Sequence, residues 1–367
     1  MTTATPRPSD ANEEAGEPSR QPALPTLPAG VTVRVVGPGD AMRGRALGML
    51  LTGRDAARDP RVAAFEDYAR RAGLDTAGLA AALSGHGTSG ERPIAAAVAM
   101  ESPGSTAMLL VSPMRGGASG DGRVAAASAC VEATVSQLPH GLGMAQCLLD
   151  LDQLAEAAAL SAAGLSKLAT LVYLQTDLPG GKHRAQRGTL PGVTMRGVDG
   201  GGGPTAVTLR CWDESPETRD LFGRAILDSY RDTRDCPGLV GTRSIEDILA
   251  GHRGSTGTHA FDATLWNVAL CEGPSGPEPV GVLLLARLPE QEAIELVYLG
   301  VSDTARGRGL GRSLLRRGLA QSLRTGAGQM LLAVDENNAP AIALYRSVGF
   351  GPQQRRAAWV RFLQAGK

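Results

Sequence analysis

The sequence of 367 residues has no net charge, few aromatic residues and few cysteines. Lysine plus arginine and aspartate plus glutamate each number 37, so no global field attracts nucleic acid or an anionic membrane. The 5 cysteines are odd in number and form no C-x-x-C pair, which favours reduced thiols and indicates neither a disulfide framework nor a metal site. Partners must therefore be inferred from a particular site.

The chain also lacks a long apolar run. No stretch is long and apolar enough to span a bilayer, and residues 1–30 lack the uninterrupted apolar segment of a signal peptide. Their mixture of Pro, Ser, Thr, Ala and acidic residues predicts a disordered tail. We expect a cytoplasmic protein that binds neither membrane nor nucleic acid, with enough length for two domains.

One stretch combines a strand, a glycine-rich turn and a helix. Residues 295–301 (ELVYLGV) are a short apolar run that predicts a buried strand, residues 306–311 read RGRGLG, and residues 312–323 repeat leucines at helical spacing. The first turn of a helix has unpaired N–H groups and the positive end of the dipole, so such a turn is typical of an anion site, to which Arg306, Arg308 and Arg312 would add charge. A plain tight turn has the same composition.

Two further segments make the pattern specific. Residues 330–335 predict another strand, and residues 338–350 predict a short helix closed by Gly349. R-x-x-G-x-G at 306–311 after a strand, with N-x-x-A-x-x-L-Y at 338–345, resembles the acyl-CoA-binding half of the GNAT family of N-acetyltransferases. This resemblance implies an α/β (α+β) fold in which helices flank a mixed, mostly antiparallel sheet. It also implies acetyl-CoA as co-substrate, no metal, and direct attack by an amine in a ternary complex.

The resemblance implies a role for each site residue. Glu295 would be the base, and Tyr345 would be the acid for the departing thiolate. The residues expected against CoA are Leu299, Gly300, Val301, Arg306, Gly307, Arg308, Gly309, Leu310, Gly311, Arg312 and Asn338. The first three would act through backbone groups where the strand splays, a distortion that Gly300 would permit. Ordinary structural roles stay open: Glu295 as a salt-bridge partner, Tyr345 in core packing, and Asn338 as a helix N-cap.

The order of predicted elements repeats along the chain. At an offset of 349 − 164 = 185, Gly164 falls on Gly349 and Asp150 on Asp335. We therefore predict two tandem GNAT-like domains, at 31–178 and 205–367, joined by a linker at 179–204 that contains a short strand near 193–195. The same stretch around Glu295 resembles a tandem member of the family that acetylates a cysteinyl-sugar amine.

The first copy is predicted to be degenerate. At the shared offset, Arg306, Gly309 and Gly311 fall on Asp121, Val124 and Ala126, and Tyr345 falls on Leu160. Leu109 or Leu110 stands where Glu295 would be. A carboxylate and larger side chains would obstruct a pyrophosphate, so we expect only the second domain to be competent. The glycines at 116, 117, 120 and 122 leave a modified loop open.

The acceptor is the least determined feature. In this family the segment between the first two strands shapes the acceptor pocket, which makes Tyr230, Asp232, Asp235, Arg243 and His252 candidates; a solvated turn and an amphipathic helix is the alternative. We expect a small-molecule amine. Acetylation of a protein N-terminus would need an open groove between the domains, and a non-catalytic acyl-CoA sensor would need neither Glu295 nor Tyr345. The sequence does not decide whether the donor carries an acetyl or a longer acyl group, or whether the protein is a monomer or a homodimer.

Overall fold

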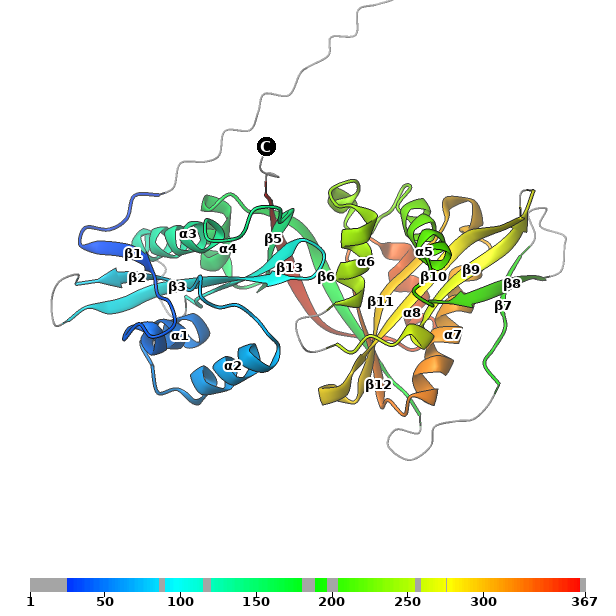
Figure 1. The fold of residues 1–367 in the computed structure, drawn as a ribbon, viewed down its shortest axis with the longest axis horizontal. Helices are drawn as coiled ribbons and strands as arrows, with labels where there is room; N and C mark the ends of the chain where they lie inside the picture. Colours follow the sequence, from blue (N-terminus) through cyan, green and yellow to red (C-terminus); the bar gives the residue numbers. More distant parts are fainter. Residues whose placement is uncertain are drawn as a thin grey trace, which may run out of the picture.

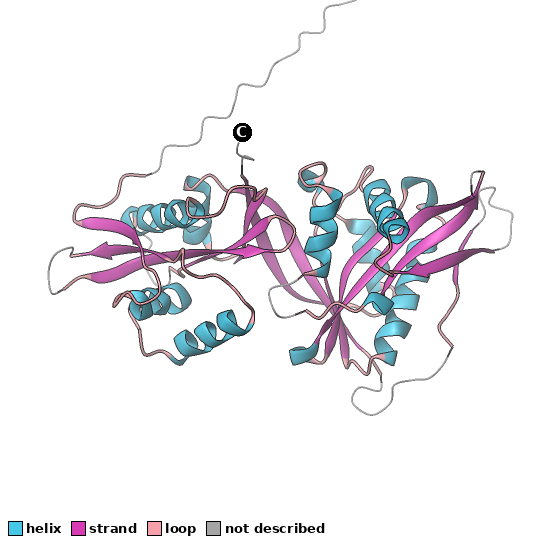
Figure 2. Ribbon diagram, viewed as in Figure 1, coloured by secondary structure: helices cyan, strands magenta, loops and turns pink. Residues whose placement is uncertain are grey.

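The computed structural model describes residues 25–85, 90–114, 120–179, 189–196, 204–254, 259–274 and 276–363. It consists of two halves, each a sheet with helices on both faces (Figures 1 and 2). The first half contains β1 (Val31–Val35), α1 (Arg43–Thr52), α2 (Pro60–Arg71), β2 (Ala80–Ser84), β3 (Arg92–Ser102), β4 (Thr106–Val111), α3 (Asp121–Val135), β5 (Met144–Asp150), α4 (Leu154–Ala162) and β6 (Ser166–Asp177).

The second half contains β7 (Val193–Arg196), β8 (Pro204–Cys211), α5 (Pro216–Ser229), α6 (Ile245–Arg253), β9 (Trp266–Gly273), β10 (Gly276–Leu288), β11 (Ala293–Val301), α7 (Leu310–Arg324), β12 (Gln329–Asp335), α8 (Ala339–Arg346) and β13 (Gly351–Phe362). Separate apolar clusters pack beneath α5 with α6 and beneath α7 with α8, on opposite faces of the sheet. Among the described helices, none has the length and apolar character needed to cross a bilayer.

The halves exchange their last strands. The strand order is β1-β2-β3-β4-β5-β13-β6-β12-β11-β10-β9-β8-β7. β6 follows α4 in the first half but pairs with β12 of the second, while β13 pairs with β5 of the first. The two exchanged strands also pair with each other, and Figure 1 shows them crossing between the halves. Continuous backbone hydrogen bonding therefore joins the halves.

The predicted offset of 185 residues between the two copies is confirmed from β5 onward and is wrong for the helix that precedes β5. The offset of 185 relates the starts of β5 and β12 (329 − 144) and of β6 and β13 (351 − 166). It does not hold for the preceding helices, because α3 begins at Asp121 and α7 at Leu310 (310 − 121 = 189). The connection between α3 and β5 is four residues longer than the one between α7 and β12 (8 against 4), and this shifts the alignment.

Two equivalences change as a result. Gly120 and Gly122, not Val124 and Ala126, stand where the second half has Gly309 and Gly311. Met108 pairs with Gln146 as Glu295 pairs with Leu331, so Met108 replaces Leu109 or Leu110 as the counterpart of Glu295. The first half thus keeps two glycines at the start of its helix and still lacks both the carboxylate and the tyrosine.

Most predicted elements are present, with several local differences. β2 and β13 are absent from the prediction, and the alanine-rich β2 has low strand propensity. The N-cap of α1 is Met42, whose N–H donates a hydrogen bond to the carboxylate of Asp40. Of the predicted tail, residues 1–24 lie outside the described residues, whereas Leu27 packs on the core. All five cysteines are free, as predicted.

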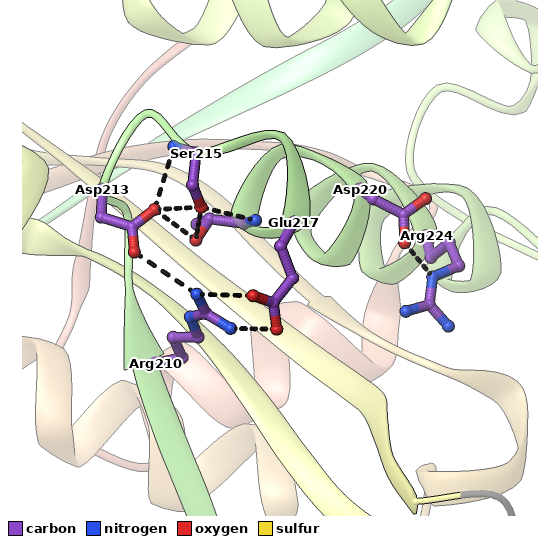
Figure 3. Close-up of polar contacts among 7 residues, drawn as sticks. Arg210, Asp213, Ser215, Glu217, Asp220 and Arg224 are labelled. Carbon is purple, nitrogen blue, oxygen red and sulfur yellow. Dashed lines mark hydrogen bonds and ion pairs between the residues drawn. The ribbon is translucent and has the colours of Figure 1, made fainter.

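Helix α5 begins after the N-cap formed by Ser215 (Figure 3). The Ser215 hydroxyl accepts a hydrogen bond from the N–H of Thr218 at 3.1 Å, and Asp213 accepts one from the N–H of Ser215 at 3.0 Å. Arg210 contacts both Asp213, at 3.4 Å, and Glu217, at 2.5 Å. These contacts fix one end of α5, and its other end reaches the candidate site.

Candidate active site

In the second half, the two central strands β11 and β12 separate from each other beside the glycine-rich turn. The parallel strands β11 and β12 pair only from Ala293 with Gln329 to Glu295 with Leu331, although β11 continues to Val301 and β12 to Asp335. A cavity of about 1150 Å³ extends from this fork to the start of α7. Its volume slightly exceeds the usual range for small-molecule sites, which suits a long ligand.

Every residue predicted to contact CoA lines this cavity: Leu299, Gly300, Val301, Arg306, Gly307, Arg308, Gly309, Leu310, Gly311, Arg312 and Asn338. Tyr345 lines it as well, and Glu295 is not among the described residues that do. The cavity lining also includes Asp232 and Asp235, two of the predicted acceptor contacts, and Ala333 on β12. Residues far apart in the sequence therefore converge on one space.

Backbone conformation explains two glycines of the turn. Gly307 and Gly309 have φ of 72° and 84°, in the left-handed region that side chains disfavour. A Cβ on either would meet nothing within 4 Å, so conformation rather than crowding requires glycine. α7 starts at Leu310 without a side-chain cap, and its first N–H groups have no intrahelical partner. The turn therefore offers free N–H groups to an anion.

The arginines of the turn mainly hold neighbouring backbone. Arg306 donates to the carbonyl of Ser229 at 2.7 Å, which ties the end of α5 to the turn. Arg308 donates to the carbonyl of Arg196 on β7 at 2.7 Å, and the N–H of Arg196 donates to the carbonyl of Arg308 at 2.9 Å. β7, which falls within the predicted linker, thus forms one wall of the cavity. No motif in the sequence signals that role.

Strand β11 contains a bulge at Val297, since Leu284 pairs with Tyr298 while Leu285 pairs with Leu296. The bulge lies three residues before Gly300. Gly300 itself keeps a regular register with β10, and a Cβ there would lie 2.6 Å from the Ser229 hydroxyl. Glycine is needed because the end of α5 approaches β11 closely.

Tyr345 lies on α8 with 7% of its surface exposed and its ring packed on Phe350. Burial, and then the nearby Asp235, raise the pKa of its phenol, which keeps the hydroxyl protonated. Burial also raises the pKa of Asp235, whose carboxylate accepts a hydrogen bond from the N–H of Asp335 at 2.9 Å. Asn338 caps α8 by accepting a hydrogen bond from the N–H of Ala341, as one of its predicted roles requires, and it also lines the cavity.

Glu295 lies at the fork, on the sheet face that α5 and α6 cover. It forms the last pair of β11 with β12, and its carboxylate contacts the imidazole of His259. Both side chains are 28% exposed. His259 is distant in sequence and belongs to no motif, so only the fold reveals this pair.

The other acceptor candidates pack together under α6. The Tyr298 ring lies 5.3 Å from the His252 ring and 6.1 Å from that of Tyr230. Burial, and then Arg243, lower the pKa of His252 to about 4, so its imidazole is neutral. Cys236 is a poor nucleophile, because burial raises the pKa of its thiol to about 12.

The first half of the chain covers one side of the acceptor candidates at α6. The turn between β3 and β4 lies against α6, which stands between the halves (Figure 1). Ser105 donates a hydrogen bond to Asp247, and a Cβ on Gly104 would lie 2.4 Å from the carbonyl oxygen of Asp247. Across the junction, Arg71 of α2 lies 3.6 Å from Glu290, in the turn between β10 and β11. Each half thus contacts a hairpin of the other.

Residues 244–350 match the model of the acetyltransferase (GNAT) family. They are a GNAT domain. The predicted resemblance is therefore confirmed, and the match spans the GNAT glycine-rich turn, the fork and α8. The described part of the chain holds no group of three or more His, Cys, Asp or Glu side chains that could bind a metal ion.

Curated relatives are similar to part of this chain. The mycothiol acetyltransferase of Geodermatophilus obscurus is 36% identical over 96 residues, covering 26% of this chain and 27% of the relative. That of Thermomonospora curvata is 30% identical over 210 residues, covering 54% of this chain and 57% of the relative. The aligned part of the chain thus spans less than two thirds of either relative.

The fold resemblance extends further. A GCN5-related N-acetyltransferase from Sphaerobacter thermophilus superposes with a TM-score of 0.53 at 18% identity, covering 93% of this chain and 98% of the other. At this identity the likeness concerns the fold alone. The α/β fold class with two GNAT-like halves is confirmed.

Proposed function

We propose that this chain is an acetyl-CoA-dependent N-acetyltransferase that acts on a primary amine of a small molecule. The supporting observation is a cavity in which the parted strands, the glycine-rich start of α7 and the phenol of Tyr345 come together. The relatives named as mycothiol acetyltransferases support acetyl transfer as the reaction.

The cavity fits acetyl-CoA at both ends. The free N–H groups at the start of α7 suit the pyrophosphate, because they combine donors with the positive end of the helix dipole. Beyond Glu295 the edge of β11 that faces β12 is unpaired, so its backbone groups can bond the pantetheine amides as a neighbouring strand would. The thioester would then lie near Tyr345.

The expected mechanism is direct attack within a ternary complex. Glu295 takes the proton of the amine, directly or through water. Backbone N–H groups near Leu299–Val301 stabilise the negative charge that develops on the thioester oxygen. Tyr345 donates its proton to the departing thiolate, and its raised pKa ensures that the proton is present. No acyl-enzyme is required.

A small acceptor is favoured over a protein N-terminus. The turn between β3 and β4 packs against α6, so the first half covers the region that an extended peptide would need. The N-terminal domain, as predicted at 31–178, would then shape the acceptor pocket instead of catalysing a reaction. Cytoplasmic location, no partner besides the small molecules, and monomer or homodimer are part of this proposal.

The first test is calorimetric titration of acetyl-CoA into the wild type and into a Gly309→Asp, Gly311→Asp double variant. We expect binding to the wild type, loss of binding in the variant, and thiol release when a panel of small amines is added. Failure of the wild type to bind would refute the proposal. A sensor instead of an enzyme would be indicated if Glu295→Gln and Tyr345→Phe left every CoA-dependent property intact.

A further inference from the structure

Glu295 lies at the vertex of the fork. Glu295 with Leu331 is the last pair between β11 and β12, and the next residue, Leu296, already lines the cavity. On β12, Ala333 lines the cavity two residues beyond Leu331 and offers only a methyl group. A ligand that follows the free edge of β11 would therefore bring its reacting end close to Glu295.

His259 is held against this carboxylate by its own segment. The next residue, Ala260, forms a two-way backbone bridge with Arg287 of β10, with N–O distances of 2.8 and 3.1 Å. Arg287 also binds the carboxylate of Asp262 at 2.8 Å. The segment from 259 to 262 is thus anchored to β10, the strand beside Glu295, and the imidazole Nε2 contacts the Glu295 carboxylate.

Other titratable or charged groups face the pair from two more strands. Tyr173 is on the exchanged strand β6, where it pairs with Ala333 of β12. Burial raises the pKa of its phenol, Arg356 lowers it, and the charge of Glu295 raises it further. The guanidinium of Arg356, on β13, lies 6.0 Å from the Tyr173 ring centre. Neither group is the partner of the Glu295 carboxylate, which is His259.

We propose that His259 is a positioning residue that orients Glu295 and carries its proton to solvent. This inference rests on the proposed function. The proton moves from the nitrogen of the acceptor amine to the Glu295 carboxylate, from there to the neutral imidazole of His259, and then to water. The imidazole is 28% exposed, so solvent reaches it. The amine, now neutral, attacks the thioester and displaces the thiolate, which takes the proton of Tyr345. The proton that the nitrogen loses on forming the amide restores the phenol of Tyr345, and Glu295 is again ionised.

This role predicts a specific dependence on pH. In the wild type, relay requires both the Glu295 carboxylate and the His259 imidazole to be unprotonated, so kcat/KM should rise with pH. Without the imidazole only the carboxylate is required, so the rise should move toward acid, with a plateau lowered by roughly tenfold or more. A merely structural role would lower the plateau and leave the rise in place.

The experiment compares wild type, His259→Gln, Glu295→Gln and the control His140→Gln, which alters an exposed histidine elsewhere. The first readout is the NMR spectrum of the imidazole groups, in which the signal lost in His259→Gln belongs to His259. We expect that signal to change position in Glu295→Gln, because the variant replaces the carboxylate that the imidazole contacts. An unchanged signal would overturn the pairing.

The second readout is the pH profile of thiol release from acetyl-CoA, with water or a small amine as acceptor. A rise shifted toward acid in His259→Gln, but not in His140→Gln, supports the relay. If Glu295→Gln is inactive while His259→Gln keeps the wild-type profile, the relay is wrong and the acetyltransferase stands. If the wild type releases no thiol, the acetyltransferase proposal fails, and the role of His259 fails with it.

Discussion

Ser105 and Asp247 join the two halves through a hydrogen bond of 2.5 Å between hydroxyl and carboxylate. This bond holds the pKa of the Asp247 carboxyl below its usual range, with Ser244, the cap of α6, adding to the effect. Asp247 lies in the first turn of α6, the helix that carries His252. The turn between β3 and β4 therefore positions a helix of the acceptor region.

Removal of the Ser105 hydroxyl should loosen α6. We expect Ser105→Ala to lower the free energy of unfolding by about 1 kcal/mol, since it deletes a bond to a charged group, and to leave acetyl-CoA affinity unchanged. Chemical denaturation and calorimetry measure the two quantities. Ser136→Ala is the control, because the Ser136 hydroxyl bonds only within its own helix end, to the Glu132 carbonyl. Equal effects of the two variants would argue against the joining role.

The phenol of Tyr345 can be removed without disturbing its ring. Tyr345→Phe keeps the packing against Phe350 and deletes only the proton donor. We expect thiol release from acetyl-CoA to fall by roughly 100-fold, while calorimetry shows unchanged binding. Loss of both binding and turnover would instead indicate that the residue supports the cavity, and full activity would assign the acid role elsewhere.

Local sequence patterns predicted well which residues of the glycine-rich turn and of α8 line the cavity. The glycines at 307 and 309, the cap at Asn338 and the position of Tyr345 all follow from spacing within single elements. Such features depend on backbone conformation and helix geometry, which nearby residues determine.

Features that depend on distant contacts were not predictable. β6 and β13 have equal lengths and equivalent places in the repeat, so nothing local shows that they exchange sheets. The partner of Glu295, His259, comes from a segment with no motif. The bulge at Val297 is visible only in the register with β10, and the four extra residues after α3 misaligned the glycines of the first half.

The neutral His252 should make the protein sensitive to acid. Its folded-state pKa, about 4, lies below the usual value near 6.5, so the unfolded chain binds more protons between these values. The contribution of the neutral His252 to the free energy of unfolding is therefore fully present above about pH 6.5. It is lost as pH falls toward 4, and the loss is on the order of 3 kcal/mol. Denaturation at a series of pH values measures this loss.

His252→Phe should remove most of that acid sensitivity. The ring can still pack on Tyr298, and the buried Nε2 has no hydrogen-bond partner among the described residues, so its loss leaves nothing unpaired. The exposed His140 supplies the control variant His140→Phe, which should keep the wild-type dependence. If the two variants behave alike, another group causes the acid sensitivity.

The glycines at the start of α3 raise the question of a second acetyl-CoA site. Gly120 and Gly122 correspond to Gly309 and Gly311, but a Cβ on Gly122 would lie 2.8 Å from the Pro28 ring. The segment before β1 therefore occupies the space beside this helix start. At Gly311, by contrast, a Cβ would make only ordinary contacts, at 3.5 and 3.7 Å, with side chains.

We therefore predict one acetyl-CoA per chain, bound in the second half. Gly311→Asp should abolish binding, because it places a carboxylate where the phosphates would lie while the fold tolerates a side chain there. Gly120→Asp is the matched control: Gly120 has an ordinary φ of −59° and open space around it, so the variant should fold and bind as the wild type does. Calorimetry gives both stoichiometry and affinity. Two sites in the wild type, one of them lost in Gly120→Asp, would show that the first half binds acetyl-CoA despite Pro28.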